Sequence, residues 1–149
     1  MSDSDANKAI VRRYFEMFNS GDLTQLADIV SQDYGDKLDG QSSGIDVIRG
    51  YLEGLKSSFP DFTWTIEQII GEGDRVAVMN RVSGTQVNDF GEIKATGNRI
   101  DFAAFQFYRI ADGKLAEHWE VADFAKFQEQ LTAKPAASAF KAFQNTLKG

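Results

Sequence analysis

Residues 108–123 read YRIADGKLAEHWEVAD, and this stretch decides the fold of the chain. Asp112 and Gly113 are a turn pair between two segments in which apolar and polar residues alternate, which is the sequence signature of a β-hairpin. Residues 62–70 and 75–85 show the same alternation around a second glycine-rich turn. The sequence therefore predicts a four-stranded antiparallel meander over residues 62–70, 75–85, 99–110 and 114–121.

Helical periodicity precedes this meander. Apolar residues recur at three- and four-residue spacing over residues 6–19 and again over residues 45–58, where Pro60 stops the pattern. Between these two segments, Asp22 is the expected N-cap of a helix that reaches Val30.

The end of the chain has two parts. A last helix is expected over residues 124–131, and the alanine-rich residues 132–149 carry Phe140, Phe143 and Leu147 at helical spacing. We expect a single domain over residues 1–131, followed by a tail that is either helical or disordered.

Helices followed by a meander predict an α+β domain, in which three N-terminal helices pack on one face of a curved antiparallel sheet and a short C-terminal helix follows. Such a sheet wraps a cone whose open end leaves a pocket suited to small molecules. The opposite face of the sheet, with Trp119 or its neighbours, has no helix to cover it. We expect a second copy of the chain to cover that face, giving a homodimer through the sheets.

The composition excludes several kinds of chemistry. The 149 residues include no cysteine and one histidine, His118, so thiolate nucleophiles, cysteine zinc sites and multi-histidine metal sites are excluded. A formal charge of −6 argues against nucleic acid or an anionic membrane surface as a partner. The opening MSDSDAN lacks the features of a signal peptide, and no apolar run reaches the ~18 residues of a membrane span. We expect a soluble cytoplasmic protein.

Three stretches together resemble one known family: VRRYFEMFNSGD at residues 11–22, TGNRIDF at residues 96–102, and the hairpin at residues 108–123. They look like the SnoaL-like polyketide cyclases, or ester cyclases, of the nuclear-transport-factor-2-like superfamily, and the resemblance covers roughly residues 7–131. It implies the cone fold and a cofactor-free intramolecular aldol condensation that closes the last ring of an aromatic polyketide ester.

The resemblance also implies site residues. The family's acid/base aspartate falls at Glu120, its assisting histidine at Gln106, and its loop asparagine at Asp36. All three positions are substituted. Glu120 keeps a carboxylate, whereas Gln106 has no titratable group.

From the residues alone, strand alternation places His118 and Glu120 on one face of the last strand. With a two-residue loop at the hairpin turn, Gln106 lies beside Trp119. With a three-residue loop, Gln106 pairs with His118 and Ala104 pairs with Glu120. We expect the second register, partly because the resemblance favours it.

On such a face Glu120 is the candidate base for an acidic C–H, with His118 or Asp123 as a second proton carrier and Gln106 as a donor to a substrate oxygen. Aromatic surroundings disfavour the charged carboxylate and move its pKa toward the working range. The expected ligand is a small hydrophobic carbonyl compound, and no metal or cofactor is expected. The predicted ligand contacts are Gln106, Asp36, Tyr34, Phe102, Ala104, Tyr14 and Tyr51.

Each candidate also has a structural interpretation. Glu120 is alternatively a solvated acid on an edge strand, and His118 a hydrogen-bonded structural residue. Asp123 is alternatively the N-cap of the final helix, and Gln106 a partner of the neighbouring strand. Two further functions therefore stay open: a ligand-binding domain without turnover, and a hydrolase or dehydratase of the same fold.

Overall fold

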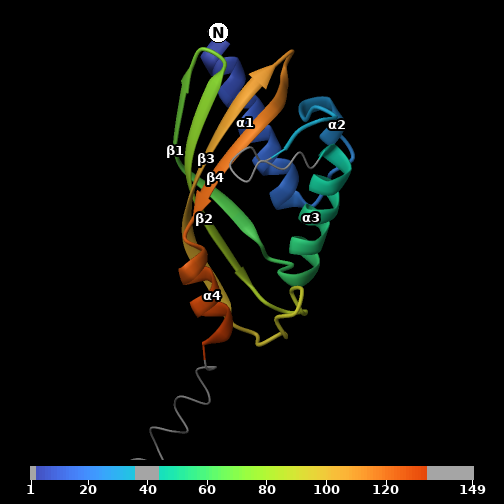
Figure 1. Cartoon of the computed structure of the whole chain (residues 1–149), viewed down its shortest axis with the longest axis vertical. Helices are drawn as coiled ribbons and strands as arrows, with labels where there is room; N and C mark the ends of the chain where they lie inside the picture. The colour runs from blue at the N-terminus through green and yellow to red at the C-terminus, as the bar shows by residue number, and fades with distance from the viewer. Residues whose placement is uncertain (1–2, 36–43, 134–149) are drawn as a thin grey trace, which may run out of the picture.

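The computed structural model describes residues 3–35 and 44–133. In that part of the chain the four strands form one antiparallel sheet in the order β1-β2-β3-β4, with α1, α2 and α3 on one side and α4 beyond the end of β4 (Figure 1). This confirms the predicted α+β architecture. The predicted tail helix lies outside the described residues. The elements are α1 (Asp3–Ser20), α2 (Leu26–Ile29), α3 (Gly44–Ser58), β1 (Thr63–Glu72), β2 (Arg75–Thr85), β3 (Arg99–Ala111), β4 (Lys114–Ala122) and α4 (Phe124–Thr132).

The first helix packs directly on the sheet through an aromatic stripe. Phe15 and Phe18 of α1 place their ring centroids 4.9 and 4.3 Å from that of Trp64 on β1. At Gly71 the backbones come so close that a Cβ would lie 3.2 Å from the carbonyl oxygen of Ser4. This tight contact favours a glycine where α1 crosses β1.

The second helix is shorter than the sequence predicted. The structure begins α2 at Leu26, four residues after Asp22, whose carboxylate instead accepts hydrogen bonds from the N–H and hydroxyl of Thr24 at 3.1 and 2.7 Å. The prediction that Asp22 caps a helix reaching Val30 is wrong, because a carboxylate bonded two residues ahead forms a local turn instead.

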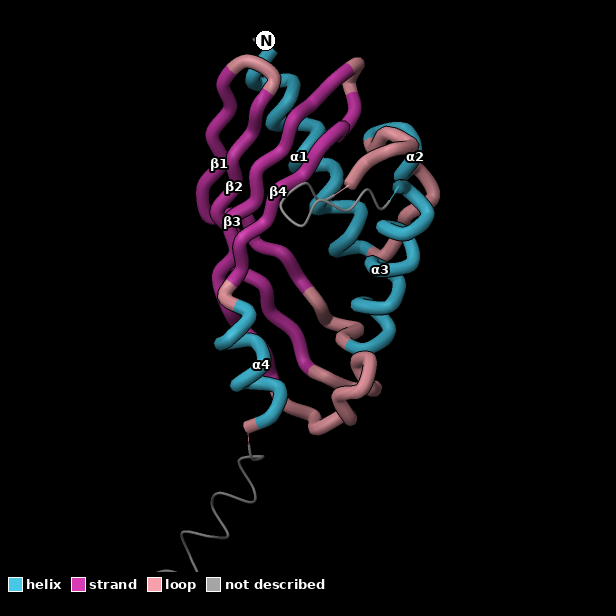
Figure 2. Tube along the Cα trace, viewed as in Figure 1, coloured by secondary structure: helices cyan, strands magenta, loops and turns pink. Residues whose placement is uncertain are grey.

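The third helix stands away from the sheet. In Figure 2, α3 runs alongside the inner face of the sheet, joined to β1 by a short connection. Ile45, Leu52 and Leu55 are its buried apolar residues. Side chains between α3 and the strands, rather than direct backbone packing, form the interior at this end of the molecule.

The β3–β4 hairpin differs from both registers that the sequence suggested. Asp112 and Gly113 form a two-residue turn with φ of 52° and 73°, as a type I′ turn requires. Next to the turn, Ile110 pairs with Leu115, but the next residue, Arg109, pairs with Glu117. Ala116 is therefore an extra residue, a β-bulge, and the shifted register pairs Gln106 with Glu120. The three-residue loop and its pairs are therefore wrong, and so is the pairing of Gln106 with Trp119.

This bulge determines which side chains of β4 face the helices. Leu115 is fully buried, and strict alternation after it would bring Glu117 inward. Because Ala116 is an extra residue, His118 and Glu120 face inward instead. The prediction that these two residues share a face with Gln106 is confirmed, although by a different register.

The free edge of β4 is covered by the segment that follows α2. The N–H of Ser31 donates to the carbonyl of Leu115 at 3.0 Å, and the N–H of His118 donates to the carbonyl of Gly35 at 3.1 Å. These bonds satisfy backbone groups that an edge strand would otherwise expose. They also bring Tyr34 against His118.

Two side-chain amides take the place of missing strand partners. Asn19 of α1 accepts from the N–H of Trp64 at 2.8 Å and donates to its carbonyl at 2.9 Å. Gln130 of α4 does the same at Asp101 of β3, at 2.7 and 2.9 Å. The two helices are thereby tied to the sheet by paired hydrogen bonds.

The outer face of the sheet carries large exposed apolar side chains. Phe105 is 59% exposed and Val121 63% exposed, and they border an open groove of about 310 Å³. Trp119 lies on this face against Phe107, with ring centroids 5.8 Å apart. None of the helices that the structure describes is long and apolar enough to span a membrane.

The paired bonds of Asn19 predict a stability effect. Asn19→Ala leaves both backbone groups of Trp64 without a partner, and the free energy of unfolding should fall by roughly 2 kcal/mol, about 1 kcal/mol per bond. Asn7→Ala is the matched control, because Asn7 lies on the same helix and makes a single exposed bond, 3.1 Å long, to the carbonyl of Gly73. Urea unfolding measures both, and equal losses would contradict a special role for Asn19.

Candidate functional site

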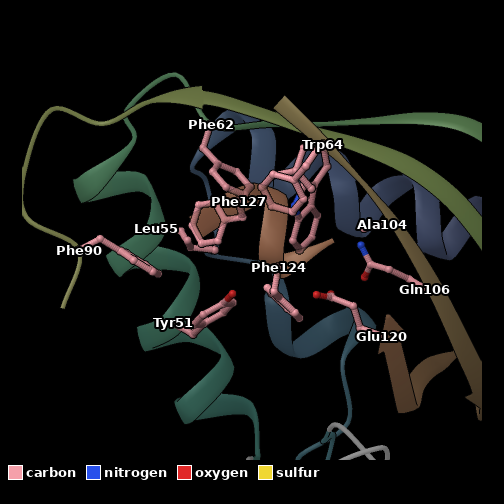
Figure 3. A pocket seen from close by; sticks show the side chains of 12 residues that line it. Tyr51, Leu55, Phe62, Trp64, Phe90, Ala104, Gln106, Glu120, Phe124 and Phe127 are labelled. Carbon is pink, nitrogen blue, oxygen red and sulfur yellow. The ribbon is translucent and has the colours of Figure 1, made fainter. Parts of the chain in front are cut away.

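A small cavity lies between α3, α4 and the inner face of the sheet (Figure 3). Its volume of about 40 Å³ holds a few water molecules at most. Most of the wall is apolar, and the aromatic part includes Tyr51, Trp64, Phe102, Phe124 and Phe127. A ring compound fits only if wall side chains move, and Tyr51 and Phe124, which are 53% and 56% exposed, are placed to do so.

Glu120 brings a carboxylate into this apolar wall. It comes from β4, directly opposite Gln106 of β3, and its carboxylate points into the cavity in Figure 3. The side chain is 23% exposed. The inward position depends on the bulge at Ala116.

Behind the cavity, Gln106 is the centre of a buried hydrogen-bonded cluster. Its Oε1 accepts from the hydroxyl of Tyr108 at 2.6 Å and from Nε2 of His118 at 3.0 Å. Its Nε2 donates to Oδ1 of Asn80 at 3.1 Å. Gln106 lines the cavity as predicted, and its carboxamide is also held by these three protein partners.

His118 is enclosed by aromatic rings and is neutral. Its ring is stacked on those of Tyr34 and Tyr108, with centroids 5.8 and 4.9 Å away. Burial lowers its pKa to about 4, so the ring carries a single proton near neutral pH. The contact with the carboxamide oxygen of Gln106 places that proton on Nε2, which donates it. The 3.8 Å approach of this nitrogen to the Glu120 carboxylate is therefore not an ion pair near neutral pH. This geometry favours the structural interpretation of His118.

The buried tyrosines support this cluster from the side of α1. Tyr14 is hydrogen-bonded to Tyr34, and its ring lies 6.3 Å from that of Tyr108. Burial raises the pKa of all three hydroxyls, which keeps them neutral. Tyr14 and Tyr34, both predicted ligand contacts, thus pack behind His118 rather than in the cavity wall.

The remaining predicted residues separate into three groups. Tyr51, Phe102 and Ala104 line the cavity, and in Figure 3 the Tyr51 hydroxyl points toward its centre from the wall opposite Glu120. Although Tyr51 is half exposed as a whole, its hydroxyl end is enclosed by the cavity wall, and this burial raises the pKa of Tyr51 to about 12, so the hydroxyl is a neutral donor. Asp123 caps α4 by accepting from the N–H of Lys126 at 3.0 Å, its structural interpretation. Asp36 lies outside the described residues.

Sequence analysis missed Asn80 and the aromatic residues of α4. Asn80 is a fully buried amide between Val78 and Val82. A polar residue among the inward-facing apolar residues of a strand is the same signal that identified Gln106, and it could have identified Asn80. Phe124 and Phe127 were placed on a helix but not in the wall. In residues 3–35 and 44–133, no group of three acidic or histidine side chains is placed to hold a metal ion.

Comparisons with known proteins agree with this arrangement. A family model described as SnoaL-like polyketide cyclase matches residues 8–131. No curated protein matches the sequence. The structure of TsrD from Streptomyces laurentii is 25% identical, covers 89% of this chain and 99% of its own, and superposes with a TM-score of 0.80.

Two further solved structures are similar. IdmH from Streptomyces antibioticus is 26% identical over 85% of this chain and 99% of its own, with a TM-score of 0.71. A SnoaL-like polyketide cyclase from Agrobacterium tumefaciens is 22% identical over 84% of this chain and 97% of its own, and its TM-score of 0.73 indicates the same fold.

The buried neutral state of His118 predicts a pH dependence of stability. An exposed histidine has a pKa of about 6.5, and burial lowers that of His118 to about 4. Between these values the unfolded chain binds a proton that the folded chain does not, so the free energy of unfolding falls as pH drops. From pH 7.5 to 5 this group should remove roughly 2 kcal/mol.

Urea unfolding at the two pH values measures this loss. His118→Phe keeps a flat ring between Tyr34 and Tyr108 without a titratable group, so its loss over the same range should be smaller than that of the wild type by about 2 kcal/mol. Equal losses in both proteins would show that the folded chain protonates His118 freely.

Proposed function

The chain belongs to the SnoaL-like polyketide cyclase family, and on this premise we propose that it performs cofactor-free acid/base catalysis on a hydrophobic carbonyl compound. The reaction is an intramolecular aldol condensation or a related isomerisation, with Glu120 as the base. The observation that carries this proposal is the Glu120 carboxylate, directed into a cavity whose wall is mostly aromatic and apolar.

The chemistry needs one base and one donor. Glu120 removes a proton from a C–H that is activated by a neighbouring carbonyl, and the electron pair moves onto that carbonyl oxygen as an enolate. The α-carbon then attacks a second carbonyl of the same molecule, a C–C bond forms, and the new alkoxide takes a proton back. A neutral donor in a dry site stabilises the enolate oxygen, and the Tyr51 hydroxyl supports this role because it faces the same cavity.

A second candidate is a binding domain without turnover. It is favoured by the contacts of Gln106 and His118, which hydrogen-bond to each other behind the cavity. In that case Glu120 orients a ligand instead of taking its proton. A hydrolase or dehydratase of the same fold would use Glu120 to activate a water molecule admitted to the cavity.

We also propose that the outer face of the sheet binds a second copy of this chain. Ile70, Phe105, Phe107 and Val121 are exposed there around the open groove. The charged residues beside them are neutralised within the chain, by the ion pairs of Arg81 with Asp101 and of Arg109 with Glu117. An apolar patch with an internally neutralised border suits a self-complementary contact about a two-fold axis.

Loss of the Glu120 carboxylate predicts loss of proton transfer. The probe is 2-tetralone, a bicyclic ketone whose C1–H exchanges slowly with deuterium, and NMR follows this exchange in heavy water. Glu120→Gln should lower the protein-catalysed rate by about 10²-fold or more, because a positioned base contributes ~10²–10⁴-fold. Glu117→Gln is the control, since Glu117 lies on the same strand with its side chain paired to Arg109 on the opposite face.

Equal exchange rates in both variants would eliminate Glu120 as the base. If the wild type binds 2-tetralone without accelerating its exchange, that result supports the alternative of a binding domain without turnover.

The proposed dimer is tested by light scattering after size-exclusion chromatography. The wild type should have twice the mass of the chain, and Val121→Glu should give the single-chain mass, because it places a charge in the apolar contact. Val47→Glu is the control, since Val47 is exposed to a similar extent on α3. A monomeric wild type would reject the dimer.

A further inference from the structure

In the part of the chain that the structure describes, one buried side-chain polar atom has no hydrogen-bond partner, and it is Nδ2 of Asn80. Asn80 lies on β2, fully buried, and pairs with Ala104 of β3. Its cross-strand partner Ala104, its hydrogen-bond partner Gln106 and Val82, two residues along β2, all line the cavity, so Asn80 lies directly behind that wall. We propose that Asn80 is a ligand-binding residue, whose Nδ2 donates a hydrogen bond to an acceptor oxygen of the bound molecule. This inference rests on the proposed function, because it requires a ligand in that cavity.

A chain of hydrogen bonds fixes the direction of the Asn80 amide. Tyr108 and His118 both donate to Oε1 of Gln106, which turns the nitrogen end of that carboxamide toward Asn80. Gln106 then donates to Oδ1 of Asn80. Since the oxygen of Asn80 faces Gln106, its nitrogen must face away, and it presents N–H donors for which the described protein offers no acceptor.

The same series of hydrogen bonds strengthens the Asn80 donor. Hydrogen bonds in series polarise one another, and the effect is larger where water is excluded. Two donors pull electron density from the Gln106 carbonyl, and Gln106 in turn withdraws density from the Asn80 carboxamide. Asn80 is therefore a fixed, polarised and desolvated donor, the type of group that binds a carbonyl or a negatively charged oxygen strongly.

The position of Asn80 also indicates the size of the ligand. Asn80 lies on β2 and Glu120 on β4, with β3 between them, so about two strand spacings, roughly 10 Å, separate the two backbones. A molecule that contacts both must span a comparable distance, and a rigid fused-ring compound meets this requirement. Its acidic C–H lies near Glu120, and an acceptor oxygen lies on the other edge of the ring system. Asn80 thus determines which fused-ring carbonyl compounds bind and in which orientation.

The test compares two probes of the same shape. 9-Fluorenone carries one carbonyl oxygen, fluorene carries none, and neither offers a C–H next to a carbonyl. Both are titrated against the Trp119→Phe variant, which leaves Trp64 in the cavity wall as the only tryptophan and fluorescence reporter. We expect 9-fluorenone to bind about tenfold more tightly than fluorene. Asn80→Leu should reduce this ratio to about one, whereas Asn88→Leu, the same change at an exposed asparagine, should preserve it.

Each outcome decides the inference. A tenfold preference that survives Asn80→Leu, or a wild-type protein without any preference, overturns the role of Asn80 and leaves a water as the partner of its amide. In that second case fluorene still binds, so the aromatic cavity of the proposed function stands. If neither probe binds, the proposed function and this inference both fail.

A measurement on the unaltered residue keeps the inference testable if Asn80→Leu does not fold. In 15N-labelled protein, 9-fluorenone should move the side-chain amide protons of Asn80 downfield, and fluorene should move them far less. Equal movement with both probes would overturn the proposal.

Discussion

The β-bulge at Ala116 is the constraint on which the site depends. A β-strand alternates its side chains strictly, so the inward position of Leu115 would carry Glu117 inward and turn Glu120 to the outer face. One extra residue reverses that alternation without changing the hairpin turn. The result is a strand whose first part completes the apolar core and whose second part brings a histidine and a carboxylate to the interior. The ion pair of Glu117 with Arg109 on the outer face supports the same register.

The inward-facing polar residues form two layers with different roles. In the deeper layer, Tyr108, His118, Gln106 and Asn80 are joined by hydrogen bonds, and burial keeps His118 neutral. Buried polar groups are tolerated because they are partnered, and such a cluster fixes donor directions. In the outer layer, Glu120 and Tyr51 face the cavity. The deeper layer holds the strands in place and sets the direction of the Asn80 amide, whereas Glu120 and Tyr51 are the polar groups that already face the cavity.

Much of this could be predicted from the sequence, and the exceptions have physical causes. Long periodic segments gave the helices and strands, because burying one face fixes the period. The predicted second helix was too long, because an aspartate such as Asp22 can cap a turn as readily as a helix. The hairpin register was wrong because a bulge inside a strand leaves no glycine or proline to mark it. The contact between His118 and Tyr34 could not be predicted from the sequence, because it depends on a loop that pairs with the edge of β4.

The central claim is that the bulge turns Glu120, and not Glu117, toward a ligand cavity. The most direct measurement is the side-chain carboxyl 13C shift of both residues in labelled protein as 2-tetralone is added. The account predicts that the Glu120 signal moves with saturation while the Glu117 signal stays in place. Movement of the Glu117 signal with a stationary Glu120 signal would contradict it, since that result places Glu117 in the cavity and removes the bulge.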